Sequence, residues 1–209
     1  MILSKNNTEK LISFIKSECG KHNVKLSIKR GKYVKINKVK TSGYFDSTKQ
    51  ELVCAKQNPN FLIVLAHEFC HMTQWIDSRN GKCDVWLKYE KSNLNIFDEW
   101  LLDKTKNFRK NTLKAALFKS LNLELDNERR THKLLKSFGM NQKELDLYVQ
   151  KSNAYVLFYL YLLETRNWYK PGNAPYENKT VVSAMSKKFN MNYKSLSKKI
   201  RSVYIQENI

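Results

Sequence analysis

The sequence predicts an α+β fold that is mainly helical, with a small antiparallel sheet in its first third. Hydrophobic residues make up 42% of the 209 residues and aromatic residues 12%, which is enough material to build a core. Apolar residues recur at helical spacing over most of the chain, whereas an alternating pattern is confined to residues 23–56. These three observations together favour a folded α+β protein over a disordered or all-β chain.

The first predicted helix starts near Thr8, a favourable N-cap residue, and places Leu11 and Cys19 on its apolar face. Gly20 stands where a left-handed residue would end this helix. From Asn23 to Lys56, short apolar runs are separated by polar turns. This pattern predicts three or four short antiparallel strands.

Helices are expected over most of the remaining chain. Phe61–Ile76 is strongly apolar and contains no glycine or proline, which predicts a buried helix. Residues 77–91 are expected to form a loop. Apolar periodicity then predicts four further helices, at Asn93–Leu102, Thr112–Leu121, Leu123–Phe138 and Asn141–Trp168.

The proline- and glycine-containing segment Lys170–Pro175 interrupts the chain after the last long helix. Beyond it, residues 178–206 contain seven basic residues and no acidic one. We therefore expect one domain over residues 1–170. Residues 171–209 are expected to form a basic, helical C-terminal extension packed on the same domain.

The pattern H-E-x-x-H occurs inside the predicted buried helix, as His67, Glu68 and His71. Four residues advance an α-helix by about 400°, so the two histidines project from one face and can bind the same metal ion. Glu68 lies about 100° around the helix, where it can take a proton from a metal-activated water without ligating the metal. A carboxylate buried without a partner costs several kcal/mol, which favours a metal site over a core that merely contains two histidines.

A third ligand must come from elsewhere, because the longer pattern H-E-x-x-H-x-x-G-x-x-H is absent. Glu124 and Glu128 share one face of a predicted helix whose later turns are apolar, and either can supply the ligand. The alternative interpretation is a solvated acidic turn paired with Arg129 and Arg130. Two imidazoles and one carboxylate leave a fourth position open for water, which is typical of catalytic zinc.

With this motif and the later glutamate pair, the chain resembles the zincin metallopeptidases, in particular the gluzincin arrangement. Including Gly43–Asp46 and Gln150–Tyr155, it is similar over roughly residues 40–170 to uncharacterised metallopeptidases encoded by bacteriophages. The resemblance implies a zincin-like domain over residues 1–170 with Zn²⁺ as its cofactor.

The same resemblance implies roles for individual residues. His67, His71 and Glu124 would hold the metal, and Glu128 would be the acid that orients a ligating histidine. The reversed roles of Glu124 and Glu128 stay open. Glu68 would act as general base in the hydrolysis of peptide bonds.

The resemblance to zincins also implies a hydrogen-bond donor to the transition-state oxyanion. Tyr155 is the candidate, with Tyr148 and His132 as alternatives, and core packing is the other interpretation of the tyrosines. Either Glu51–Ala55 or Gly43–Asp46 could be the strand that pairs with an extended peptide.

The formal charge of +19, from 38 basic and 19 acidic residues, indicates which binding partners the protein surface can attract. Besides a protein or peptide substrate, such a surface can attract nucleic acid, or it can simply be well solvated. Two alternatives follow: a DNA-associated protease of the SprT-like kind, or a non-enzymatic nucleic-acid-binding protein with a structural metal site. No membrane association is expected, and the few scattered cysteines favour the cytoplasm, which for a phage-encoded protein is that of the host.

Overall fold

The computed structural model describes residues 3–36, 39–90, 94–170 and 172–209. The chain is of the α+β class and divides into two compact units. Unit 1 comprises Met1–Asp84 and Arg130–Asn141, and unit 2 comprises Val85–Arg129 and Gln142–Ile209.

A three-stranded sheet forms the centre of unit 1. Its order is β1 (Lys25–Lys29), β5 (Glu51–Ala55), β4 (Gly43–Asp46), with β4 antiparallel to β5 and β1 parallel to it. A separate antiparallel hairpin is formed by β2 (Val34–Ile36) and β3 (Val39–Thr41). The prediction of a purely antiparallel sheet is therefore wrong for β1, because alternation of apolar residues identifies a strand but carries no information on its direction.

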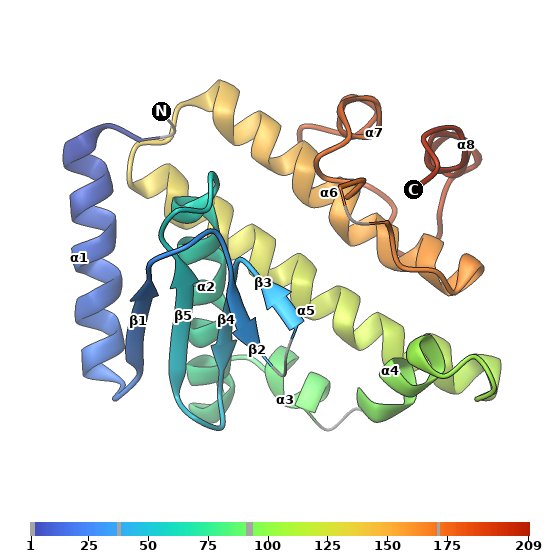
Figure 1. The fold of residues 1–209 in the computed structure, drawn as a ribbon, viewed down its shortest axis with the longest axis horizontal. Helices are drawn as coiled ribbons and strands as arrows, with labels where there is room; N and C mark the ends of the chain where they lie inside the picture. Colours follow the sequence, from blue (N-terminus) through green and yellow to red (C-terminus); the bar gives the residue numbers. More distant parts are fainter. Residues whose placement is uncertain (1–2, 37–38, 91–93, 171) are drawn as a thin grey trace. The chain divides into compact units, whose positions relative to one another are not determined.

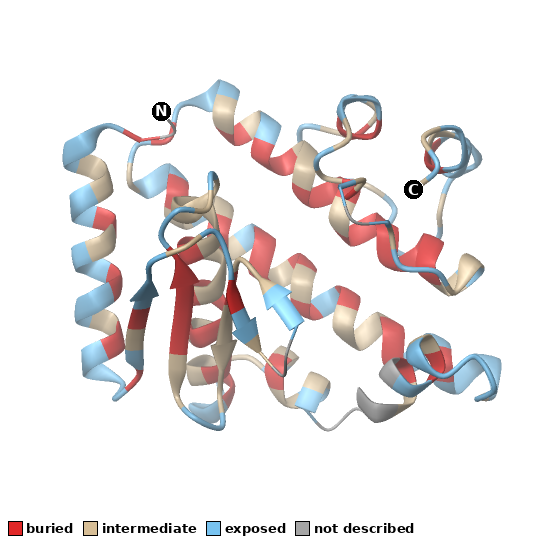
Figure 2. Cartoon of the chain, viewed as in Figure 1, coloured by how far each residue is buried: buried red, intermediate tan, exposed pale blue. Residues whose placement is uncertain are grey.

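Two helices pack on this sheet. α1 spans Lys5–Lys21 and contacts β1, whereas α2, Phe61–Arg79, contacts β4 and β5 (Figure 1). Figure 2 shows that β5 is buried along most of its length, since it has a strand on each side and α2 across one face. α1 begins after Ser4, whose side chain accepts a hydrogen bond from the backbone of Asn7, rather than after Thr8.

β4 and α2 approach closely at Gly43. A Cβ atom on Gly43 would lie 2.7 Å from Val64 Cγ1 and 3.0 Å from the backbone oxygen of Val53. Any larger residue at this position would require the Val64 side chain and the backbone of β5 at Val53 to shift. Gly43 thereby brings the first turns of α2 against the sheet.

Three expectations about helix boundaries are corrected. α2 continues to Arg79, and the expected loop after it contains α3, Val85–Glu90, whose Trp86 is buried. Instead of two helices, α5 is one helix over Lys110–Ser137, because no glycine or proline interrupts it. It ends as expected before Gly139, which has φ +82°. α5 contributes residues to both units.

Unit 2 is built around α6, Gln142–Thr165, most of whose residues from Tyr148 onward are buried. It also contains α4 (Leu94–Leu102), α7 (Lys179–Ser183) and α8 (Lys198–Gln206). The fully buried Tyr204 of α8 donates a hydrogen bond of 2.8 Å to the carbonyl of Ala154. The C-terminal extension thus packs on α6. Its helical segments are the two short helices α7 and α8, with turns and irregular chain between them.

Among the described residues, no helix is both long enough and apolar enough to cross a lipid bilayer.

Candidate metal centre

The two histidines of the H-E-x-x-H pattern lie together on α2. Their ring centroids are 4.8 Å apart and the ring planes are almost perpendicular, at 87°. His67 is half-buried and His71 is 9% exposed. An unbroken helix therefore places two imidazoles side by side at the edge of the core, as their spacing predicts.

Gln74 fixes the orientation of His71. Its Oε1 lies 2.9 Å from His71 Nδ1, and its side chain is fully buried. With the amide oxygen as acceptor, Nδ1 carries the hydrogen and Nε2 keeps its lone pair for a metal ion. Gln74 was not among the residues expected at the site, although its spacing of three residues from His71 on one helix was a usable signal.

Glu124 completes a group that could hold a metal ion. His67, His71 and Glu124 each offer one ligand atom, and these atoms all lie within 4.8 Å of one another. This is the only such group found among the described residues, and it includes neither Glu128 nor His132. Two imidazole nitrogens and one carboxylate oxygen are a donor set that suits a divalent transition metal.

Glu128 lies one helical turn after Glu124 and is buried. Its Oε2 accepts hydrogen bonds from the hydroxyls of Tyr148 and Ser152 on α6, the latter at 2.5 Å. These contacts account for a buried carboxylate next to the candidate ligand. Tyr148 is thus a partner of Glu128.

Arg130 connects α5 to α2. Its Nη1 donates to Asp77 Oδ2 at 2.6 Å and to Thr73 Oγ1 at 3.3 Å. Asp77 was expected in a loop but lies on α2, and the ion pair with Arg130 was therefore not expected. Because both partners sit on helices, the pair fixes the last turns of α5 beside α2 within unit 1.

Glu68 is half-buried on α2 and its charge reaches the central strand. Burial, and after it the charge of Glu68, raise the pKa of Cys54 on β5. The carboxylate of Glu68 is thus near enough to β5 for its charge to act on the Cys54 thiol, and it belongs to the same turn of α2 as His67.

Tyr155 and Tyr159 form a hydroxyl pair on α6. Their oxygens are 3.1 Å apart, and either hydroxyl can donate. Burial, and after it the negative charge of Glu124, raise the pKa of both phenols well above the usual value of 10.0. Both groups therefore stay protonated at neutral pH and remain hydrogen-bond donors.

Comparison of the chain with protein families, with curated protein sequences and with solved structures found no match in any of the three.

Proposed function

We propose that the protein is a zinc-dependent metallopeptidase of the zincin type. The observation that carries this proposal is the convergence of His67, His71 and Glu124 within 4.8 Å, with Glu68 on the same turn as the first ligand. A purely structural metal site has no use for a carboxylate at the position of Glu68, whereas hydrolysis requires a general base.

The residues of the chain divide the chemistry between them. His67, His71 and Glu124 would hold zinc, which when bound would supply Lewis-acid activation of a water molecule and of the substrate carbonyl. Glu68 takes a proton from that water as its oxygen bonds to the carbonyl carbon, and returns the proton to the amide nitrogen as the C–N bond breaks. Tyr155 donates a hydrogen bond to the oxyanion, and Tyr159 supports the Tyr155 hydroxyl.

The sheet offers a place for an extended peptide. β5 is paired on both sides, so of the two candidate strands β4 is the one at the edge of the described sheet. β4 also contacts α2, where Gly43 meets the turn that precedes His67. A peptide added to the edge of β4 would extend the sheet beside the metal-binding helix.

The test compares Glu68→Gln with the wild type on an unfolded protein mixture. We expect both proteins to bind one zinc ion per chain by elemental analysis, and cleavage by Glu68→Gln to fall by about 10²–10⁴-fold. Glu9→Gln, the same change at an exposed position of α1, is the matched control. Equal cleavage by Glu68→Gln and wild type, or absence of bound metal from the wild type, would refute the proposal.

Recruitment to nucleic acid is a second candidate function, favoured by the β2–β3 hairpin. Lys35 and Lys40 are paired across it and exposed, and Lys40 lies 5.1 Å from the ring centre of the exposed Tyr33. Cations beside an exposed aromatic ring suit a single strand, which binds through phosphate contacts and base stacking. Binding of single-stranded DNA that is weakened steeply by salt and by Lys35→Gln with Lys40→Gln supports this role, and no binding contradicts it.

A further inference from the structure

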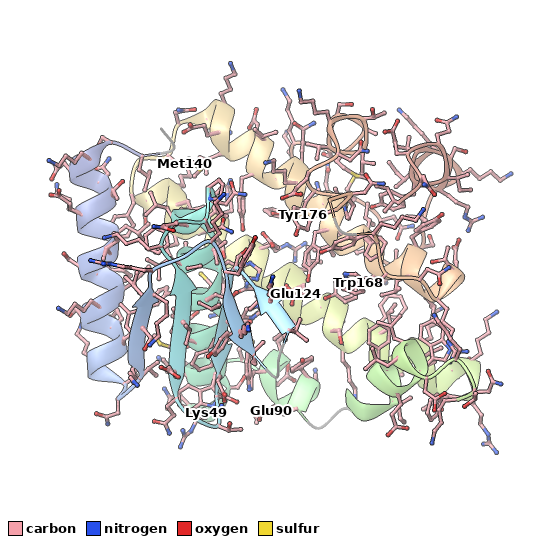
Figure 3. The ribbon with its side chains drawn as sticks, in the orientation of Figure 1. Lys49, Glu90, Glu124, Met140, Trp168 and Tyr176 are labelled. Carbon is pink, nitrogen blue, oxygen red and sulfur yellow. The ribbon has the colours of Figure 1, made fainter. Side chains whose placement is uncertain are left out.

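A loop without regular secondary structure joins α7 to α8 in unit 2 and is rich in lysine. All seven basic residues of the segment 178–206 are exposed, and the segment contains no acidic residue. Figure 3 shows nitrogen-bearing side chains projecting around α7 and α8. The exposed lysines of the loop and of the start of α8 are here called the lysine surface: Lys187, Lys188, Lys194, Lys198 and Lys199.

The backbone of this loop is held by one buried side chain of α6. Asn153 is fully buried, and its Nδ2 donates to the carbonyls of Ser186 and Lys188 at 2.8 and 3.1 Å. Its Oδ1 accepts a hydrogen bond of 2.5 Å from the hydroxyl of Tyr193. Both amide hydrogens and the oxygen of Asn153 are thereby used. The loop therefore follows a fixed path over α6, and its lysines are in place before a partner arrives.

The two kinds of side chain on this loop have different surroundings. Its larger apolar side chains are partly buried and pack against the hydrophobic core of unit 2: Phe189, Met191, Tyr193 and Leu196. The lysines of the same loop are exposed. Packing thus accounts for the apolar residues of the loop but gives no role to its amines.

Few carboxylates neutralise these amines. Lys187 lies 3.9 Å from Asp146 Oδ2, and the other four lysines of the surface form no ion pair with any described residue. Burial raises the pKa of Tyr193 to about 12, and the charge of Arg129 on α5 opposes that rise, so Arg129 adds a further cation near the loop. Like charges without interspersed acids repel one another, and a bound anion would relieve this repulsion.

The chemistry of the surface defines its partner. Lysine amines bind phosphate oxygens as point charges and read no sequence. Single strands are bound through exposed rings that stack on bases, whereas no aromatic residue within 172–209 is exposed. A duplex needs no such ring, and it presents one negative charge about every 1.7 Å along its axis. An anionic membrane favours exposed apolar side chains among the lysines, and within 172–209 Ile205 is the one large apolar residue that is exposed.

We propose that the lysine surface binds the phosphate backbone of a nucleic-acid duplex without reading its sequence. This role goes beyond the proposed peptidase function, because it requires neither a metal ion nor cleavage. It also concerns unit 2, whereas the β2–β3 hairpin, whose exposed ring suits single strands, belongs to unit 1.

The first experiment titrates the full-length protein into a fluorescent DNA duplex and measures anisotropy. With four lysines on phosphates, log K falls against log salt concentration with a slope of about −3.6, which weakens binding about 150-fold between 50 and 200 mM salt. A triple variant with Lys188→Gln, Lys194→Gln and Lys198→Gln should reduce the steepness of that slope by about 2.7. It should also bind the duplex at least tenfold more weakly than the wild type at 50 mM salt.

The matched control removes the same charge from exposed positions of α1 in unit 1, by Lys5→Gln, Lys10→Gln and Lys16→Gln. We expect the control to bind the duplex within threefold of the wild type. Equal weakening by the two triple variants would show that net charge alone attracts the duplex, and it would overturn the proposal. Absence of duplex binding by the wild type would overturn it as well.

The second experiment locates the contact. The protein is acetylated briefly with and without the duplex, and modification of each lysine is measured by mass spectrometry. We expect at least threefold protection of Lys188, Lys194 and Lys198, and unchanged modification of Lys5 and Lys16. Equal modification of the lysine surface with and without the duplex would contradict the assignment of the contact to this surface.

Further arms identify the source of the phosphates. A DNA and an RNA duplex of one sequence share the phosphate backbone, so binding of either supports the proposal and the tighter one is the preferred ligand. Phosphatidylserine vesicles should not compete with the duplex. Vesicle binding that the lysine-surface variant loses, with neither duplex bound, would assign the surface to a membrane and overturn the proposal. None of these measurements uses cleavage, so failure of the peptidase proposal and failure of this one are distinguishable.

Discussion

Replacement of Gln74 by leucine tests whether the orientation of His71 matters for metal binding. Leucine nearly preserves the volume of the fully buried side chain but removes the oxygen that lies 2.9 Å from His71 Nδ1. Loss of a partner that orients a metal-ligating histidine typically weakens metal binding 10–100-fold, equivalent to about 1.4–2.8 kcal/mol. We therefore expect Gln74→Leu to fold and to bind zinc at least ten times more weakly than the wild type.

The measurement is competition for zinc against a chromophoric chelator, with circular dichroism to verify folding. Gln150→Leu is the matched control, because it loses a hydrogen bond to the carbonyl of Met185, away from the triad, and should bind zinc as tightly as the wild type. Gln74→Glu keeps an acceptor and should retain binding. A folded Gln74→Leu protein that binds zinc within threefold of the wild type would show that the contact does not orient the ligand.

Three further predictions concern stability, measured as the free energy of unfolding in urea. Gly43→Ala should lower the free energy of unfolding by about 1–3 kcal/mol, because its new Cβ would overlap Val64 and the backbone of Val53. As a control, Gly20→Ala in α1 meets no atom within 4 Å and should raise it by about 0.5–1 kcal/mol. Unchanged stability of Gly43→Ala would refute the close approach of β4 and α2. Tyr204→Phe should cost about 0.5–1.5 kcal/mol through loss of its bond to Ala154, and a neutral result would contradict that bond. The hydrogen bond from Ser27 lowers the pKa of Glu51 below its usual 4.5; partial burial opposes this shift and the charge of Lys25 adds to it. The ionised Glu51 side chain therefore stabilises the folded state above pH 4.5, and this stabilisation is lost as the pH falls through the lowered pKa. The difference in stability between wild type and Ser27→Ala should therefore shrink below pH 4.5, and a difference that grows there would reverse the assignment.

The parts of the fold that the sequence predicts are those governed by local spacing. Helix α2 follows from an apolar run without helix breakers, and the side-by-side histidines follow from the geometry of a helical turn. Glu124 could be named as a candidate metal ligand because acidic residues are unusual on a helix face whose following turns are apolar. Spacing could not choose between Glu124 and Glu128, since the two lie on the same side of one helix.

The features that sequence reasoning missed depend on segments that meet only in three dimensions. The parallel direction of β1 is set by the path of the chain through β2, β3 and β4, and apolar alternation does not record it. A cavity next to Glu124 takes its wall from α3, α4, α5, α6 and Trp168, so no single segment carries its signature. The role of Arg166 was missed for the same reason. An arginine at the end of a helix is usually exposed, and nothing in the local sequence indicates that it donates to three carbonyls 60 to 66 residues earlier in the chain.

Unit 1 draws on two stretches of chain, one ending at Asp84 and the other beginning at Arg130. On the ribosome, the histidine pair therefore emerges well before Glu124 and before Arg130, the residue that later pairs with Asp77. A nascent chain at that stage presents two imidazoles but lacks the acidic ligand, and it holds a divalent cation only weakly. Translation order thus postpones completion of the candidate metal site until α5 has been made.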